Sequence, residues 1–584
     1  MMAPALDLPD RIWSVAAARQ LRGLIKTETQ DSVDGVGSGL DVTWRMTMPV
    51  TPTEILRHHV ERRPKATAFV FGEDVWTYER LGADADRVAH AFVALGLRPG
   101  DRVALHMVNR PEMLVAYYAC FQVGLIAAPL RTAFKPAELI PLLGRMRPSL
   151  YIGDAALYGN VAGADPSILP AARRFLVGAA EDRRAKPWSM LLGGLAREAA
   201  PAVIDVHAPA VMLNTSGTTG EPKFIIHTAA TLSACVEILT YSGLSEGEVA
   251  VEAVPLAHAS GLFTFLAYVR CGMPFVLLEQ FDPDAVLDAI ERHRCNWVLA
   301  MPSMFADLLA RQRARPRNVS SLRMCLTGGD VCPLQLQEQF PVHFGVPLRI
   351  VWAATEVIAF SYGLVPGPVS RIVPGVQFRL VDHDGADVPC GETGELLLRG
   401  PNITVGYWAG PGQIADPLNN GWFHTGDLMQ QGEGEDLWFV GRKKDLIIRG
   451  GTNISPVEVE QVLATAHPEV QGAAVAGLPD AVLGERVVGF VELANGGKRL
   501  VLEEILATAR SRLADYKVPE ILMIIDAIPR NALGKVDRKL LARMSAELLG
   551  GRPERFDRIA SPSDRRFAAP GGSTPFKKRA RQSK

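Results

Sequence analysis

The sequence predicts an α/β fold: a large N-terminal domain of mostly parallel sheets flanked by helices, with a β-rich subdomain, followed by a small α+β C-terminal domain. Strand-like runs alternate with runs of helical spacing, as at 275–279 and 283–294. Residues 376–400 change to the pattern of hairpin strands. At 584 residues the chain is too long for one core, so two or more domains are expected.

The expected elements follow in order along the chain. Helical spacing covers 52–62 and 78–96, and 102–105 is a buried strand. Hairpin strands are expected at 376–382 and 394–399. The small C-terminal domain is expected to hold a helix at 456–466, strands at 470–476 and 486–493, and a helix at 501–514. This order of elements leads to the division into segments that follows.

Four segments are expected. Residues 1–48 form a variable N-terminal extension with an amphipathic helix over 12–25, and 49–443 form the large domain. Residues 444–548 form the small domain. Residues 549–584 are rich in Arg, Pro, Gly and Ser, and we expect a disordered, solvated tail there.

Composition excludes several classes of protein. Hydrophobic residues make up 48% and charged residues 21%, which is ordinary for a soluble enzyme, and a net charge of -1 argues against a nucleic-acid binder. The 7 cysteines include no C-x-x-C pair, which favours reduced thiols and a cytoplasmic protein. No secretory signal and no apolar run of about 18 residues is found, so no membrane helix is expected. A homodimer is left open.

The most informative segment is residues 214–223, Asn-Thr-Ser-Gly-Thr-Thr-Gly-Glu-Pro-Lys. Glycines let several N–H groups point at one anion, hydroxyls add donors, and the lysine adds a compact charge. Apolar runs on both sides predict a strand, a loop and a strand, so the loop can wrap a polyphosphate. A solvated Gly/Thr turn explains such a loop in isolation equally well. The residues assigned to phosphate binding are Thr215, Ser216, Gly217, Thr218, Thr219, Gly220 and Lys223.

Five further motifs follow in a fixed order: Pro-Leu-Ala-His at 255–258, Trp-Ala-Ala-Thr-Glu at 352–356, Gly-Trp-Phe-His-Thr-Gly-Asp-Leu at 421–428, Gly-Arg-Lys-Lys-Asp at 441–445 and Pro-Arg-Asn-Ala-Leu-Gly-Lys at 529–535. From about residue 50 to about residue 545 the chain resembles the adenylate-forming superfamily, and most of all its stand-alone acyl- and aryl-CoA ligases. The resemblance implies ATP, Mg²⁺ and coenzyme A.

Making an acyl adenylate brings a carboxylate to the α-phosphate of ATP, so the protein must position and neutralise two anions. Glu356 is a hard oxygen ligand of the kind Mg²⁺ takes, and Thr355 can bond the phosphates. A helix N-terminus is the alternative interpretation of this Thr-Glu pair. Asp427, after Gly426, can accept bonds from both ribose hydroxyls, or it lies in a surface turn.

The resemblance assigns further nucleotide contacts. Trp352 stands where the family usually has Tyr and would stack on adenine, although a core Trp is the alternative. Arg442 would reach the ribose or phosphates, unless it is a surface arginine. The adenine-contacting turn is matched by Gly328, Gly329 and Asp330, the last standing where the family often has Ala.

Four assignments concern the reacting groups and domain motion. Lys535 would bridge the substrate carboxylate and the α-phosphate, and His258, at the end of an apolar strand, would lie at the acyl site. A surface lysine and a packed core histidine are the alternatives. Gly450 and Gly451 would let a thiol arm pass, or form a tight αL turn. Lys444 is the expected hinge about which the mobile small domain rotates.

The expected function is an AMP-forming acid:CoA ligase acting on an apolar fatty or aryl acid. No acidic residue occurs in 259–265 to pair with an ammonium group, and Phe263 and Phe265 supply apolar surface, with core packing on one face of a strand as the alternative. Ala353, where the family usually has Gly, favours a medium-sized acid. An enzyme that loads a separate acyl carrier protein is the close alternative. A nucleotide-binding regulator without turnover is the alternative from another class.

Overall fold

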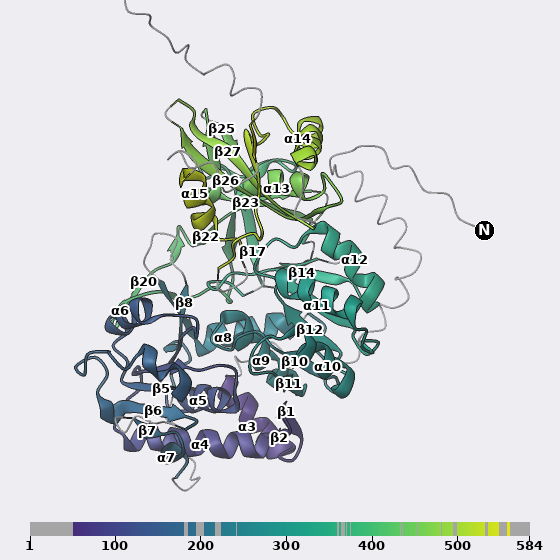
Figure 1. Ribbon diagram of the computed structural model, residues 1–584. Coiled ribbons are helices and arrows are strands. Elements are labelled where there is room, and N and C mark those ends of the chain that lie inside the picture. Colours follow the sequence, from purple (N-terminus) through teal and green to yellow (C-terminus); the bar gives the residue numbers. More distant parts are fainter. Residues whose placement is uncertain are drawn as a thin grey trace, which may run out of the picture. The chain divides into compact units, whose positions relative to one another are not determined.

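The computed structural model describes most of the chain between residues 51 and 560 (Figure 1). The described residues are 51–179, 185–193, 204–215, 223–240, 242–358, 361–363, 368–369, 371–373, 375–432, 434, 436–450, 452–480, 482–494, 499–531, 535–547 and 558–560. The expected extension at 1–48, with its helix at 12–25, lies outside them.

The chain divides into two compact units, residues 1–439 and 440–584. The sequence placed this boundary near Lys444, a few residues farther on. We describe each unit by itself.

The first sheet of the first unit has the strand order β16-β15-β14-β13-β12-β10-β11-β1-β2. Its strands from β14 to β1 are parallel, and β2, β15 and β16 are antiparallel additions at the edges. The bounds are β1 Thr67–Phe71, β2 Asp74–Thr77, β10 Ala250–Glu252, β11 Phe275–Leu277, β12 Trp297–Ala300, β13 Met324–Gly328, β14 Leu348–Trp352, β15 Ser361–Tyr362 and β16 Arg371–Ile372.

The second sheet has the order β20-β19-β9-β8-β4-β3-β5-β6-β7. It is parallel from β8 to β7, whereas β9 runs antiparallel to β8, and β19 antiparallel to β9. The bounds are β3 Arg102–His106, β4 Ile126–Pro129, β5 Leu150–Asp154, β6 Arg174–Val177, β7 Lys186–Pro187, β8 Pro209–Thr215, β9 Lys223–Thr228, β19 Gly406–Gly410 and β20 Gln413–Ala415.

Helices cover both sheets, because both faces of their strands are apolar. In β12, Trp297 and Leu299 join the core shared by the two sheets, and Val298 and Ala300 join the core on the opposite face. The shared core takes in helices α3 Pro52–Arg62, α4 Tyr78–Ala94, α5 Pro111–Gln122, α7 Ser189–Leu192, α8 Ala229–Thr240 and α9 Ala259–Cys271. The outer faces are covered by α10 Pro283–His293, α11 Pro302–Ala314 and α12 Leu334–Phe344 on one sheet and by α6 Pro136–Met146 on the other. Short 3₁₀ turns occur at Ala155–Asn160 and Ala171–Arg173.

The chain enters the described region through a well-defined helix start. The Thr51 side chain accepts the N–H of Glu54, and the Glu54 carboxylate accepts the N–H of Thr51 at 2.7 Å. This reciprocal cap explains why α3 begins at Pro52. No helix in the described part of the chain combines the length and the apolarity needed to cross a membrane.

The expected β-rich subdomain is present as an antiparallel sheet of order β17-β18-β22-β21, with β23 paired to β22. The bounds are β17 Gln377–Val381, β18 Thr393–Arg399, β21 Leu418–Asn419, β22 Trp422–Gln431 and β23 Leu437–Arg442. The division between the two units falls inside β23.

The second unit is α+β, as predicted. Its sheet has the order β25-β24-β27-β28-β29, with β26 paired to β27. Helices α13 and α14 pack on one face and α15 on the other. The bounds are β24 Ile447–Arg449, β25 Thr452–Ile454, α13 Pro456–Ala464, β26 Val470–Asp480, β27 Gly484–Leu493, α14 Arg499–Arg512, β28 Ile521–Ile524, α15 Arg538–Glu547 and β29 Arg558–Ala560.

Strand β29 corrects one expectation. It lies inside the tail at 549–584 that the composition predicted to be disordered, yet it pairs antiparallel with β28. The outer edge of β28 would otherwise present unpaired backbone groups, and three residues of the tail satisfy them.

Candidate active site

The predicted phosphate loop joins two antiparallel strands, as expected. The last registered pair of β8 and β9 is Thr215 with Lys223, and residues 216–222 lie between these two in the sequence. The loop residues from Ser216 to Gly220 lie outside the described residues. Lys223 does lie within them, and its Nζ is 4.6 Å from the centroid of the Tyr407 ring.

The base of this loop carries a half-buried cation that sequence analysis did not identify. The Arg131 Nη2 donates to the Asn214 carbonyl oxygen at 3.2 Å, and the Asn214 Nδ2 donates to the Pro129 carbonyl oxygen at 2.7 Å. Burial lowers the pKa of Arg131 to about 10, so it still carries its charge at neutral pH. It adds a positive charge beside the strand that leads into the loop.

Thr355 and Glu356 follow β14 in a bend, not at a helix N-terminus. The bend is closed by the Ala354 N–H to the Val357 carbonyl oxygen at 2.9 Å and by the reverse bond at 3.2 Å. The Glu356 carbonyl accepts the Thr404 N–H at 2.8 Å, and the Tyr407 hydroxyl lies 3.4 Å from Glu356 Oε1. The helix alternative for this pair is therefore wrong.

A second unpredicted residue, His227, links β9 to this bend. Its Nε2 lies 2.9 Å from the Thr355 carbonyl oxygen, and since a carbonyl can only accept, Nε2 carries the hydrogen. Its Nδ1 then accepts from the Thr231 hydroxyl at 3.3 Å. Burial lowers the pKa of His227 to about 4, so the ring is neutral. The sequence did carry a signal for His227, because it is a polar residue within an apolar strand.

Trp352 and Asp427, assigned separately to adenine and ribose, touch each other. The Trp352 Nε1–H donates to Asp427 Oδ2 at 3.0 Å, and both side chains are buried. Trp352 ends β14 directly before the bend that holds Thr355 and Glu356. The structure thus joins two predicted nucleotide residues through a hydrogen bond that the sequence did not reveal.

Asp427 lies in a β-bulge, where the sequence predicted a turn. The register between β18 and β22 shifts between Glu395 and Leu397, opposite residues 425–427. Gly426 adopts a φ of 71°, and the Thr425 hydroxyl accepts the Asp427 N–H at 3.0 Å. Bulges re-aim side chains, and this one directs Asp427 toward Trp352.

The glycine turn after β13 lies beside the end of β14. Gly328 pairs in parallel with Val351, and a Cβ on Gly328 would come within 2.4 Å of the Val351 carbonyl oxygen. Gly329 has a φ of 81°, which favours glycine. The Asp330 carboxylate accepts the N–H of Val331 at 2.9 Å. The turn therefore lies beside the end of β14, which Trp352 terminates, and its contact with adenine stays a prediction.

The segment after His258 is a helix, and this corrects the strand expectation. His258 is the N-cap of α9, and Phe263 and Phe265 lie two residues apart on that helix, so they point in different directions. Both rings are fully buried. Phe263 meets the His227 ring edge-to-face at 5.3 Å, on the side of the site.

Phe265 packs away from these groups. Its ring lies 5.7 Å from Tyr117 and 6.2 Å from Tyr118, within the shared core. Ala353, the third residue assigned to the substrate pocket, is half-buried beside Trp352. The pocket roles of Phe263 and Ala353 stay predictions.

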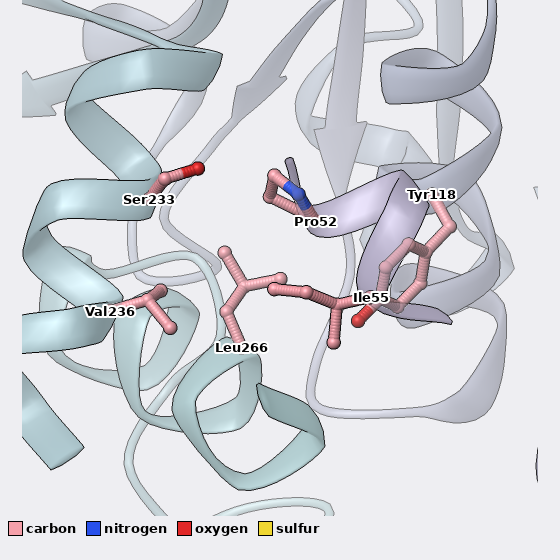
Figure 2. Close-up of a pocket in the computed structure, with 6 residues that line it drawn as sticks. All are labelled: Pro52, Ile55, Tyr118, Ser233, Val236 and Leu266. Atoms are coloured by element: carbon pink, nitrogen blue, oxygen red, sulfur yellow. The ribbon is translucent and has the colours of Figure 1, made fainter. Parts of the chain in front are cut away.

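A small apolar hollow beside Leu266 of α9 is not a substrate cavity. Figure 2 shows the side chains of Ile55 and Leu266 pointing toward each other across it. The Ser233 hydroxyl on its wall donates to the Ala229 carbonyl oxygen at 2.8 Å, within the helix. The hollow is a packing gap between helices of the shared core, lined by Pro52, Ile55, Tyr118, Ser233, Val236 and Leu266.

Glu252 is a buried acid at the end of β10, before the segment that leads to His258. The Thr264 hydroxyl donates to its Oε2 at 2.5 Å, and the Val254 N–H donates to its Oε1 at 3.0 Å. Burial raises the pKa of Glu252 to about 8, so the carboxyl is largely protonated at neutral pH.

Glu252→Gln should therefore remove a pH dependence of stability. Between the unfolded pKa of about 4.5 and the folded pKa of about 8, the folded wild type binds more protons than the unfolded chain. Its stability must fall across this window, by about 5 kcal/mol, and level off above it. Glutamine keeps one acceptor oxygen for the Val254 N–H and can donate its amide N–H to the Thr264 hydroxyl oxygen, but it does not titrate.

Thermal unfolding of both proteins at intervals from pH 5 to pH 8.5 checks this. The Tm of the variant minus that of the wild type should grow as the pH rises. Parallel curves would show that Glu252 does not titrate in this range.

In the second unit, the predicted residues lie at turns. Arg442 ends β23, and Lys444 lies in a 3₁₀ turn at Lys443–Asp445. Gly450 has a φ of 56° between β24 and β25, and its N–H donates to the Leu483 carbonyl oxygen at 2.7 Å. The αL turn is thus present, and Gly451 lies outside the described residues. The roles of these residues in binding and rotation stay predictions.

Lys535 lies in a turn closed by a bridge between Arg530 and Val536. Its N–H donates to Asn531 Oδ1 at 3.2 Å, and its carbonyl accepts the Asn531 N–H at 2.7 Å. The backbone of Lys535 therefore holds the turn, and its side chain is not needed for that purpose.

The described residues of the first unit bring contacts to three segments. These are the end of the phosphate loop at Lys223, the bend after β14, and the bulge in β22. Lys223, Tyr407 and Glu356 form one chain of contacts, and Trp352 with Asp427 forms another. A cation, carboxylates and aromatic faces arranged in this way suit a nucleotide with its phosphates. Glu356 with the neighbouring Thr355 hydroxyl also fits Mg²⁺, which takes few protein oxygens and completes its shell with phosphates.

Both parts of the chain match a known family model. The family model for the AMP-binding enzyme matches residues 56–408, and that for the AMP-binding enzyme C-terminal domain matches residues 458–535. The chain is 33% identical over 515 residues to an indoleacetate–CoA ligase of Aromatoleum aromaticum, covering 84% of this chain and 98% of that protein. It is 32% identical to the medium-chain fatty-acid–CoA ligase of Escherichia coli, covering 80% and 85%.

A solved structure shares the fold. The o-succinylbenzoate CoA synthetase of Bacillus subtilis, in complex with the acyl-adenylate intermediate OSB-AMP, superposes with a TM-score of 0.71 at 28% identity. The match covers 83% of this chain and 97% of that one.

Proposed function

The chain belongs to the AMP-binding enzyme family and is an AMP-forming acid:CoA ligase, and we propose that the acid it activates is apolar, aryl or medium-chain, and not an amino acid. The observation that carries the proposal is the lack of an ionised acid on the buried start of α9. Residues 259–265 hold no carboxylate, and the nearby Glu252 is protonated by burial and bonded to Thr264 and Val254. An ammonium group buried there would have no counter-charge.

Two observations favour an apolar acid of moderate size. Phe263 presents a buried aromatic ring next to His227, and Ala353 takes room that glycine would leave. The acids in the names of two relatives, indoleacetate and a medium-chain fatty acid, are apolar and of moderate size. A carrier-protein-loading function is disfavoured because these relatives are named CoA ligases.

The reaction proceeds in two steps, to which we assign residues. A carboxylate oxygen attacks the α-phosphorus of ATP, the bond to pyrophosphate breaks, and an acyl adenylate forms. The thiol of coenzyme A, losing its proton, then attacks the acyl carbonyl and AMP leaves. Lys223 would bind the outer phosphates and Lys535 would offset the charge where the carboxylate meets the α-phosphate. Mg²⁺, held by Glu356, would neutralise phosphate charge.

Asp427 and Arg442 would bind the ribose and phosphates, and Trp352, Gly328, Gly329 and Asp330 would contact adenine. His258, at the N-cap of α9, would lie at the acyl group. Rotation about Lys444 would present Lys535 for the first step and the Gly450–Gly451 turn for the second. Each of these roles is a proposal from the residue's chemistry and its place in the family motifs.

A substrate screen tests the proposal. Pyrophosphate exchange should be measured over fatty, aryl and α-amino acids at equal concentration, followed by CoA-dependent AMP release for the active acids. We expect the highest rates with aryl or medium-chain acids. A clear preference for a zwitterionic amino acid would refute the pocket assignment, and AMP release with a carrier protein but not with coenzyme A would favour the alternative function.

A further inference from the structure

The Tyr407 side chain contacts two charged groups of the proposed phosphate site, one over its ring face and one at its hydroxyl. The Lys223 Nζ is 4.6 Å from the centroid of its ring, and its hydroxyl is 3.4 Å from Glu356 Oε1. These three residues come from distant parts of the chain: β9, the bend after β14, and β19. No sequence motif connected Tyr407 to the site.

Backbone contacts hold Tyr407 in this place. Tyr407 is registered with Ile225 in β9, so its strand is fixed to the strand that begins at Lys223. The Thr404 hydroxyl donates to the Ile226 carbonyl oxygen at 2.5 Å, and the Thr404 N–H donates to the Glu356 carbonyl oxygen at 2.8 Å. The segment 404–407 is therefore tied both to β9 and to the bend that carries Glu356.

The chemistry of the three groups is complementary. The Tyr407 hydroxyl can donate a hydrogen bond, and the Glu356 carboxylate can only accept one. An ammonium group is attracted to the face of an aromatic ring, and a carboxylate is oriented by a hydroxyl donor.

We propose that Tyr407 is a positioning residue that separates Lys223 from Glu356 and orients the Glu356 carboxylate toward Mg²⁺ and ATP. The inference rests on the proposed function. Without the ring to hold the Lys223 ammonium group, that group and the Glu356 carboxylate would attract each other and pair. In such an ion pair, Lys223 would be less able to bind the phosphates, and Glu356 would be less able to bind the metal. Tyr407 keeps both available.

Two variants separate the hydroxyl from the ring. Tyr407→Phe keeps the ring under Lys223 but removes the hydroxyl, and Tyr407→Leu removes both. Titration calorimetry with a non-hydrolysable ATP analogue, with and without excess Mg²⁺, gives the Kd in each condition and so the gain in affinity due to the metal. Nucleotide binding is read directly, independent of turnover.

For Tyr407→Phe we expect the gain due to Mg²⁺ to shrink about fivefold, because Glu356 loses its orienting bond, while metal-free affinity stays within about twofold. For Tyr407→Leu we expect metal-free affinity to fall as well, because Lys223 then pairs with Glu356. Tyr516→Phe is the matched control: Tyr516 also has a lysine, Lys517, over its ring at 5.8 Å, but it lies in the second unit and is exposed. It should leave every Kd unchanged.

Each variant tests one of the two roles proposed for Tyr407. A Tyr407→Phe variant with the wild-type gain from Mg²⁺ would overturn the orienting role, and a Tyr407→Leu variant with wild-type metal-free affinity would overturn the separating role. Because phenylalanine has nearly the same shape as tyrosine, Tyr407→Phe tests the orienting role even if Tyr407→Leu does not fold. A wild-type protein that binds no nucleotide would overturn the proposed function, whereas normal wild-type binding with unaffected variants would overturn only this inference.

Discussion

Lys535→Ala is expected to slow acyl-adenylate formation by about 10²–10³-fold while leaving thioester formation from a supplied acyl adenylate within a few-fold of wild type. A charge that bridges the carboxylate and the α-phosphate stabilises the transition state only while that bond forms. The backbone N–H and carbonyl of Lys535 help to hold its turn, and both bonds remain when the side chain is removed.

The two half-reactions should be measured separately, the first by pyrophosphate exchange and the second by thioester formation from synthetic acyl adenylate. Lys539→Ala is a matched control, because Lys539 is an exposed lysine on the following helix, α15. It should leave both steps unchanged. An equal loss in both steps for Lys535→Ala would contradict the assigned role and indicate a general effect on the second unit.

Much of the fold could be predicted because its sheets are buried on both faces. Strands such as 102–105 and 275–279 are short apolar runs bounded by polar turns, and that pattern survives in a single sequence. Helix α9 was not predictable in the same way, since every residue from Gly261 to Val269 is buried. A helix that is apolar all round has no period of 3.6 residues to distinguish it from a strand.

The candidate site was predictable in its residue types but not in its connections. Lys223, Glu356 and Asp427 stand in motifs whose charges suit a nucleotide. The contacts that fix them join residues far apart in the chain, such as His227 with Thr355 and Trp352 with Asp427, which are 128 and 75 positions apart. Tertiary packing creates these pairs, and one sequence carries no signal of which residues will meet.

The bulge at Asp427 shows the same limit on a smaller scale. A Gly-Asp pair indicates a local break in regular structure, and the sequence analysis predicted that this break is a turn. Whether the break becomes a turn or a bulge depends on the partner strand β18, which continues past it and keeps β22 a single strand. The partner strand is a property of the fold, so the local sequence could not decide.

Trp352→Phe is expected to raise the KM for ATP about tenfold with a smaller change in kcat, because it removes the hydrogen bond that holds the Asp427 carboxylate. A hydrogen bond to a charged group is worth about 1.5–3 kcal/mol, which corresponds to a factor of ten or more. Phenylalanine keeps an aromatic face for adenine, so the lost hydrogen bond is the main change. The bond at 3.0 Å is buried, so water cannot readily replace it.

A comparison of nucleotides distinguishes this orienting role from simple packing. Asp427 would act on the ribose hydroxyls, so with 2′,3′-dideoxyATP the wild type and Trp352→Phe should differ much less than they do with ATP. Trp297→Phe is the matched control: Trp297 is also buried in the same sheet, and its Nε1 has no hydrogen-bond partner among the described residues. It should lower stability through lost packing but leave the ratio between the two nucleotides unchanged. If Trp352→Phe weakens both nucleotides equally, Trp352 acts through its ring alone, and the orientation of Asp427 must then come from the β-bulge and the Thr425 hydroxyl.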